Sequence, residues 1–295
     1  MLKKYGGRRR KCKDCHTTFS LVINVTRKLK TSAEQWILDR STLRRIEERT
    51  DVSYVSKWKQ VQEYAKHVPS PRENYAKHRE RASHILLVDA TFTKVKGEDR
   101  AIIIAYDTGL GVVDYWIDES ENATAYNCLF NRLHDAGYTP ICVVSDGHGS
   151  ILSAIADWNF PHQRCIFHLL QELKRKLTRH PHEELTGKRK VLYSRIKWIL
   201  KTRNIEKLEE KIVSFRDHTQ PIFLAYGSIL EWFWEIISHA TLHLSYEENV
   251  PNTSNLLENL NGQIKARIKT MRGIKSEESL YNLIKILLYF KNYKF

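Results

Sequence analysis

The stretch Ile85–Thr93 reads ILLVDATFT, and it decides how the rest of the chain is interpreted. Its apolar and β-branched residues are typical of a buried strand. Asp89 stands inside that run, although a carboxylate buried without a partner is strongly destabilising and usually becomes protonated. Asp89 therefore either reaches solvent at the end of the strand or meets a cation.

The segments after Ile85–Thr93 alternate between strand and helix patterns. The turn residues at 96–99 and 108–111 separate the first three strands into an antiparallel meander. A right-handed crossover through the next helix then returns the fourth strand parallel to a strand of the meander. This order predicts an α/β protein with the mixed sheet of an RNase H-like fold. The predicted elements after the first strand are strands at 100–108 and 111–117, a helix at 122–136, a strand at 141–146, a helix at 151–158 and a strand at 162–167.

A second acid stands at the end of a buried strand. The run ICVVSD places Asp146 directly after four apolar residues and before Gly147. In the predicted sheet this strand lies beside the first one, so Asp89 and Asp146 would face each other. Two carboxylates that close stay ionised only if a cation lies between them, and Mg²⁺ prefers such oxygen ligands. The alternative is a pair of solvent-facing acids at strand ends that cap turns, and Asp107 and Asp114 fit that alternative.

A third acid comes much later, in the segment NTSNLLENLNGQ at residues 252–263. Helical periodicity rotates Glu258 away from the apolar stripe of this predicted helix, so its carboxylate is free to bind a metal. Asn255 three residues earlier leaves an alternative open, because the pair also resembles a capping box. The face that carries Glu258 continues with three cations, predicted to contact DNA: Lys265, Lys269 and Arg272.

The composition favours a polyanionic partner. The 295 residues include 48 Lys and Arg against 34 Asp and Glu, which gives a net charge of +14. Nucleic acid is the usual partner of such a surplus, and a solvated basic surface is the alternative. No apolar run approaches the roughly 20 residues that span a bilayer. The five cysteines are scattered, so we expect a reducing compartment, the cytoplasm, and no membrane partner.

The N-terminal region predicts a small DNA-binding head. Residues 1–20 contain Cys12 and Cys15, a C-x-x-C pair that is half of a zinc ribbon. A structural zinc site needs four ligands, so zinc binding by this pair stays open. Residues 31–66 follow the pattern of a helix-turn-helix, with Ser53 as the cap of the second helix and Lys57 and Lys59 on it as DNA contacts. An ordinary helical hairpin is the alternative, and residues 67–82 read as a linker.

The motifs VDATF, VVSDGH, CIFH and NTSNLLENLNGQIKAR stand in one order along the chain. Together they resemble the catalytic domain of Mutator-type DDE transposases of insertion sequences. The resemblance implies a catalytic domain at 83–295 with an all-α insertion at about 169–250. It implies that Asp89, Asp146 and Glu258 hold Mg²⁺ or Mn²⁺, two ions in a two-metal site.

The resemblance also implies partners and a cellular setting. These are DNA at the terminal inverted repeats and at the target, a homo-oligomer assembled on that DNA, and a prokaryotic, nucleoid-associated location. Cys165 and His168 supply the C-x-x-H of this family. Two ligands are too few for zinc, so we expect a supporting role near the active site, and a packed Cys with a satisfied His is the alternative.

Three functions remain open on the sequence. The first is a transposase that cleaves and joins DNA with metal ions. The second is a catalytically inactive or domesticated derivative that only binds DNA, against which the complete set of acids argues. The third is an RNase H-like nuclease acting on branched DNA or hybrids, which explains neither the head nor the insertion.

Overall fold

The computed structural model describes residues 2–5, 9–12, 18–20, 22–37, 41–50, 52–178, 180, 182–271 and 273–293. The chain divides into two compact units, each built from separate segments. The first unit comprises Met1–Pro71, Thr93–Glu98 and Gln263–Phe295. The second comprises Arg72–Phe92 and Asp99–Gly262, and it carries the sheet and the candidate site. The catalytic domain at 83–295 stays a prediction; Thr93–Glu98 and Gln263–Phe295 cluster with the unit that holds the N-terminal helices.

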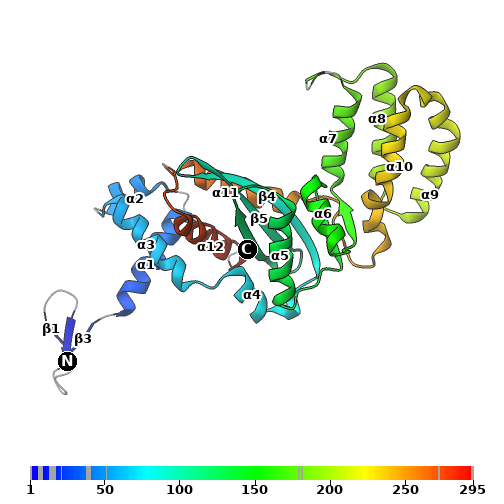
Figure 1. Ribbon diagram of the computed structural model, residues 1–295. Coiled ribbons are helices and arrows are strands. Elements are labelled where there is room, and N and C mark those ends of the chain that lie inside the picture. The colour runs from blue at the N-terminus through cyan, green and yellow to red at the C-terminus, as the bar shows by residue number, and fades with distance from the viewer. Residues whose placement is uncertain are drawn as a thin grey trace. The chain divides into compact units, whose positions relative to one another are not determined.

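The second unit is organised around a five-stranded mixed sheet with the order β6-β5-β4-β7-β8 (Figure 1). β5 pairs antiparallel with β6, whereas β4 with β7 and β7 with β8 are parallel pairs. This is the predicted order, in which the fourth strand of the fold returns beside the first, and the RNase H-like fold class is confirmed. The strands are β4 (Ile85–Val95), β5 (Glu98–Asp107), β6 (Gly111–Asp118), β7 (Cys142–Ser145) and β8 (His162–Arg164).

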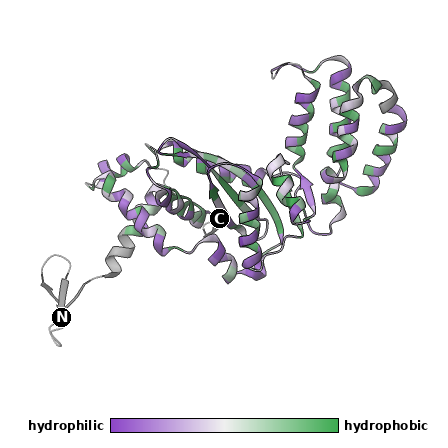
Figure 2. Ribbon diagram, viewed as in Figure 1, coloured by the Kyte–Doolittle hydropathy of each residue, from purple (hydrophilic) through white to green (hydrophobic). Residues whose placement is uncertain are grey.

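Helices α5 (Ala123–Asp135) and α6 (Gly149–Asp157) pack against this sheet. Leu86, Val88 and Ile103 of the strands share one buried core with residues of both helices. Figure 2 shows hydrophobic residues running along the central strands, as expected for strands that are covered. Asn122 begins α5 as its cap, where its side chain accepts a hydrogen bond from the Ala125 backbone at 2.8 Å.

Asp107 and Asp114 are structural acids: they are buried and do not face solvent, although Asp107 does cap a turn. Asp107 is fully buried and accepts hydrogen bonds from the backbone of Ser83, His84, Gly109 and Leu110 and from the Tyr138 hydroxyl. It therefore fixes the turn between β5 and β6. Asp114 is 1% exposed and forms a bidentate pair with Arg132 at 2.8 and 3.0 Å. Both charges are compensated inside the protein, so neither needs a metal.

The region between β8 and α11 is helical and has its own core. Buried residues from α7, α8 and α10 pack together, and α7, α8, α10 and α9 lie side by side (Figure 1). The region begins with α7 beside the sheet and returns to the sheet before Asn255, as expected of an inserted domain. The elements are α7 (Ile166–Leu177), α8 (Gly187–Leu200), α9 (Ile205–Ser214), η2 (Phe215–Thr219), η3 (Gln220–Tyr226), α10 (Gly227–Thr241) and η4 (Leu242–Ser245).

The first unit combines the N-terminal helices with the C-terminal helix α12. The predicted second helix of the helix-turn-helix is α3, and Ser53 caps it by accepting a hydrogen bond from Ser56 N at 3.3 Å. α3 packs against both α1 and α12. A separate three-stranded sheet contains Cys12 in β2, whereas Cys15 lies outside the described residues. The elements are β1 (Leu2–Tyr5), β2 (Arg9–Cys12), β3 (Thr18–Ser20), α1 (Val22–Ile37), α2 (Leu43–Thr50), α3 (Tyr54–His67) and α12 (Glu277–Tyr293).

The predicted linker at 67–82 is mostly structured. It contains α4 (Pro71–Lys77) and the short helix η1 (Arg79–Arg81). Tyr75 of α4 is 2% exposed, belongs to the core of the sheet, and donates a hydrogen bond from its hydroxyl to Gly137 O at 3.1 Å. One boundary between the units falls at Pro71, the first residue of α4. None of the described helices is both long and apolar enough to cross a membrane.

Candidate active site

The parallel pairing of β4 and β7 brings two acids together. Leu87 pairs with Val144 in this register. Two residues further along each strand stand Asp89 and Asp146, so the register directs both carboxylates to the same edge of the sheet. Gly147 follows at once with φ of +80°, a conformation that favours glycine. A Cβ at this glycine would collide with the Arg164 guanidinium, whose Nη2 donates to Asp146 O at 3.3 Å.

Asp89 is destabilised as an anion. Burial and the neighbouring charge of Asp146 raise the pKa of Asp89 to about 6. Two hydrogen bonds oppose this rise: Asn261 Nδ2 donates to Asp89 Oδ2 at 2.8 Å, and Ala90 N donates to Oδ1 at 2.9 Å. The pKa nevertheless remains high because these donors do not neutralise two adjacent carboxylates. Such a pair is the electrostatic signature of a site that accepts a cation.

Glu258 lies in the first turn of α11 (Asn255–Lys269). Ser254, the residue before the helix, donates from its hydroxyl to Glu258 Oε1 at 2.8 Å. The backbone N–H of Ser254 bonds to the Cys165 sulfur at 3.4 Å and not to Glu258. The Asn255 capping box that the sequence left open is therefore not formed, since the helix begins one residue earlier than that motif requires. The Glu258 carboxylate is instead held at 3.7 Å from His168 Nδ1.

His168 is the residue that connects the acids. The Cys165 side chain, assisted by the carboxylates of Glu258 and Asp146, raises the pKa of His168 against the opposing effect of burial. The charge of His168 also acts on Asp89. Burial favours the neutral thiol of Cys165, but its interactions with His168 and Ser254 hold the pKa of that thiol below its usual value. The structure thus brings together all five predicted residues of this region.

The donor set fits a hard divalent cation. Asp89 and Asp146 supply carboxylate oxygens from neighbouring strand ends, and burial largely shields Asp89 from solvent. The Asn261 amide oxygen is buried without a hydrogen-bond partner beside Asp89. Oxygen ligands of this kind are what Mg²⁺ and Mn²⁺ select.

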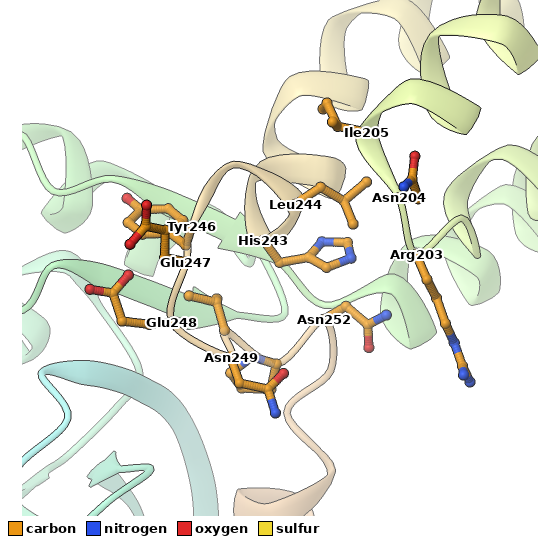
Figure 3. Close-up of a pocket in the computed structure, with 12 residues that line it drawn as sticks. Arg203, Asn204, Ile205, His243, Leu244, Tyr246, Glu247, Glu248, Asn249 and Asn252 are labelled. Carbon is orange, nitrogen blue, oxygen red and sulfur yellow. The ribbon is translucent and has the colours of Figure 1, made fainter.

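Glu247 and Glu248, the nearest acids upstream of Glu258, belong to a different feature. They line a pocket of about 760 Å³ at the base of the inserted helices, together with Arg203, His243 and Asn252 (Figure 3). Figure 3 shows both glutamates on the segment that follows η4. Glu258, by contrast, raises the pKa of His168 together with Asp146. Glu258 is therefore the better candidate for the third carboxylate.

The predicted DNA contacts divide into exposed and buried residues. Lys265 and Lys269 are exposed on α11, and Lys59 is exposed on α3. Lys57 is only 8% exposed, and its Nζ lies 3.4 Å from the Ser32 hydroxyl. The expectation for Lys57 is therefore corrected, because a lysine packed against another helix is not available to a phosphate backbone. Arg272 lies outside the described residues.

Asn261, Ser254 and Arg164 are residues of this region that the sequence motifs did not indicate. Asn261 follows Glu258 by three residues on α11, so the helical period places both side chains on neighbouring positions of one face. That spacing was the available signal for Asn261. Arg164 contacts the Asp146 backbone and Ser254 contacts the Cys165 sulfur, and these partners come from other parts of the chain, so no local pattern indicates them.

The strand order and the strand-end carboxylates define an α/β protein of the RNase H-like class. Residues 27–295 match the family model described as "Transposase, Mutator family", and the chain belongs to that family. It is similar to the transposase for insertion sequence element IS905 of Lactococcus lactis subsp. lactis (strain IL1403), with 26% identity over 188 residues and 62% of this chain. The chain spans about half the length of that curated relative, 45%.

Two solved structures match this chain at low similarity. The HTLV-2 integrase catalytic core domain in complex with magnesium, in its trimeric form, has 15% identity and a TM-score of 0.25. The match covers 42% of this chain and 88% of the integrase chain. The simian T-cell lymphotropic virus intasome in complex with PP2A regulatory subunit B56 gamma has 13% identity and a TM-score of 0.25, covering 59% and 69% of the two chains. The fold assignment rests on the strand order and not on these likenesses.

Proposed function

We propose that this chain is a DNA transposase that cleaves the terminal inverted repeats of its mobile element and joins the ends to target DNA. The observation that carries the proposal is the pairing of Asp89 and Asp146 at adjacent strand ends, with His168 linking them electrostatically to Glu258. Membership of the Mutator family of transposases supports it. A carboxyl such as Asp89, whose pKa is raised by burial and by a neighbouring acid, has no structural explanation of the kind that Asp107 and Asp114 have.

Asp89, Asp146 and Glu258 would hold Mg²⁺ or Mn²⁺, two ions in the complete site. Bound there, the metal supplies the positive charge that stabilises the attacking and leaving oxygens of a phosphoryl displacement. Ser254 and His168 hold the Glu258 carboxylate in place. Asn261 fixes the orientation of Asp89 through its amide N–H. No protein nucleophile is required, since water and then a DNA 3′-hydroxyl attack phosphorus directly.

Exposed cations would position the DNA backbone. Lys265 and Lys269 follow Glu258 along α11, and Lys59 lies on the helix that the sequence predicts for DNA recognition. Each phosphate contact contributes affinity that weakens as salt rises, because counterions are released on binding. Transposition also requires two element ends in one complex, so we expect a homo-oligomer on DNA.

The test uses DNA from the sequence that flanks this gene, whose inverted repeats would define the element ends. The purified chain is incubated with labelled flanking DNA in Mg²⁺, and cleavage and strand joining are followed on denaturing gels. Asp89→Asn and Asp146→Asn should abolish cleavage while retaining binding. Asp135→Asn is the matched control, since Asp135 is an exposed acid of α5. Cleavage at the wild-type rate by either Asn variant would refute the assignment.

A further inference from the structure

Three side chains with different ligand atoms converge at the root of the inserted helical region. The sulfur of Cys165, an imidazole nitrogen of His168 and a carboxylate oxygen of Glu258 all lie within 4.8 Å of one another. His168 Nδ1 and Glu258 Oε1 are 3.7 Å apart. The sequence offered only Cys165 and His168 as neighbours, which is one ligand short of a metal site. The fold supplies the third ligand from a position far along the chain.

Backbone contacts hold these ligands in place. Ile166 N donates to Asn252 O at 2.9 Å, which ties the start of α7 to the segment before α11. Ser254 N donates to the Cys165 sulfur at 3.4 Å, and the Ser254 hydroxyl donates to Glu258 Oε1 at 2.8 Å. Partners of this kind orient metal ligands and tune their basicity. The trio is therefore pre-organised by the chain itself.

Other roles explain the trio less well. Cys165 is fully buried, so its sulfur is not available as a nucleophile toward an external substrate. The His168 side chain interacts with the Cys165 side chain, and its Nδ1 atom lies 3.7 Å from Glu258 Oε1. A hard cation such as Mg²⁺ does not select sulfur, whereas zinc does.

We propose that Cys165, His168 and Glu258 form a binding site for a thiophilic divalent cation, Zn²⁺, with one coordination position left open. A tetrahedral zinc site with bonds of about 2.0–2.3 Å separates its ligand atoms by about 3.3–3.8 Å. The distance between His168 Nδ1 and Glu258 Oε1 already falls in that range. All three ligand atoms lie within 4.8 Å of one another, so a small rotation of the side chains would bring them to zinc-binding distances. Glu258 and His168 each retain 31% exposure, which gives the ion a route from solvent.

The position of the site defines what zinc would do. Cys165 and His168 stand where the chain leaves the sheet for the inserted helices, and Glu258 stands just after it returns. A bound ion would therefore link the two ends of the inserted helical region. Zinc would also occupy Glu258, the third carboxylate proposed for magnesium. This last consequence rests on the proposed function, whereas zinc binding itself does not.

The test is a titration of the full chain with Co²⁺, which reports thiolate ligation by a charge-transfer absorption band. The background variant Cys12→Ser/Cys15→Ser removes the other C-x-x-C pair. We expect one equivalent of Co²⁺ to bind with a thiolate band that Zn²⁺ abolishes by displacement. Cys165→Ser should lose the band, and His168→Ala should weaken binding by more than about 10-fold.

Controls separate the site from the fold and from the catalytic proposal. Cys128→Ser, in α5 and partly buried, should leave the band unchanged, and circular dichroism checks that each variant folds. Glu258→Gln offers an independent variant if Cys165→Ser fails to fold, with a similar loss of affinity expected. Absence of the band in the background variant, or its persistence in Cys165→Ser, would overturn the zinc site. Either outcome leaves Mg²⁺-dependent cleavage to be judged by its own assay.

Discussion

Replacing Asp89 by Asn should stabilise the protein in the absence of metal. The pKa of this carboxyl rises from 3.8 to about 6 on folding, so the folded state prefers the protonated form. A shift of about two pKa units corresponds to roughly 3 kcal/mol of unfavourable free energy when Asp89 is ionised. Asn is uncharged at every pH but loses one acceptor for the donors Asn261 and Ala90, which costs about 1 kcal/mol. The expected net gain at pH 8 is about 1–2 kcal/mol.

The pH dependence fixes the sign of this effect. Because the folded pKa of Asp89 is raised, its stabilising contribution is complete below about 3.8 and is lost as pH rises through about 6. The advantage of Asp89→Asn should therefore vanish at pH 4 and grow between pH 4 and pH 7. Mg²⁺ should reverse the order, since a ligand of the folded state alone stabilises it by about 2.7 kcal/mol at 100 times its Kd.

The assay is thermal melting of EDTA-treated protein with and without Mg²⁺ at several pH values. For a chain of this size each kcal/mol moves Tm by about 2–4 °C. Asp135→Asn serves as the control and should remain within about 0.5 kcal/mol of wild type, as most surface changes do. A lower Tm of Asp89→Asn at pH 8 without metal, together with an equal rise in the Tm of wild type and variant in Mg²⁺, would contradict both the raised pKa of Asp89 and its role as a metal ligand.

Four further substitutions test other parts of the molecule. Glu258→Gln should leave the free energy of unfolding within about 1 kcal/mol of wild type and lower the rate of DNA cleavage by orders of magnitude. A stable and active variant would show that Glu258 is not the third carboxylate. Lys265→Ala and Lys269→Ala should each weaken DNA binding and reduce the salt dependence of log K by about one unit of slope, measured by fluorescence anisotropy across a salt series; an unchanged slope would remove that lysine from the interface. Asp107→Ala should destabilise the protein by about 3 kcal/mol or more in denaturant unfolding, because it strands buried donors including the Tyr138 hydroxyl; a loss below 1 kcal/mol would contradict its structural role.

The positions of the first two acids could be predicted because they depend on local rules. A strand has a period of two, and a parallel partner with a right-handed crossover leaves few ways to pair. Those rules place Asp89 beside Asp146 once the strands are recognised. The cap at Ser53 was predictable for the same reason, since an N-cap is read from adjacent residues. The roles of Asp89 and Asp146 as metal ligands remain predictions.

The predictions that were wrong concern residues whose contacts come from distant parts of the sequence. Lys57 has the spacing of a surface cation on its helix, but it packs toward Ser32 on another helix. Tyr75 stands between prolines and charges that read as a linker, yet its ring fills part of the core of the sheet. Asp107 was expected at a solvent-facing turn, and its donors come from the turn and from the Tyr138 side chain. Periodicity describes one element at a time and does not say which partner covers it.

The separation of Glu258 from the other acids along the chain is the feature that local rules explain least, and the fold resolves it simply. The inserted helices leave the sheet after β8 and return before α11 at a single point, where Ile166 N donates to Asn252 O at 2.9 Å. Cys165 and Ser254 are therefore close in space although the whole insertion separates them in the sequence, and Ser254 N lies 3.4 Å from the Cys165 sulfur. Closing a longer loop adds little entropy cost, because that cost grows only with the logarithm of length. An insertion tied at its root can carry its own core without moving Glu258.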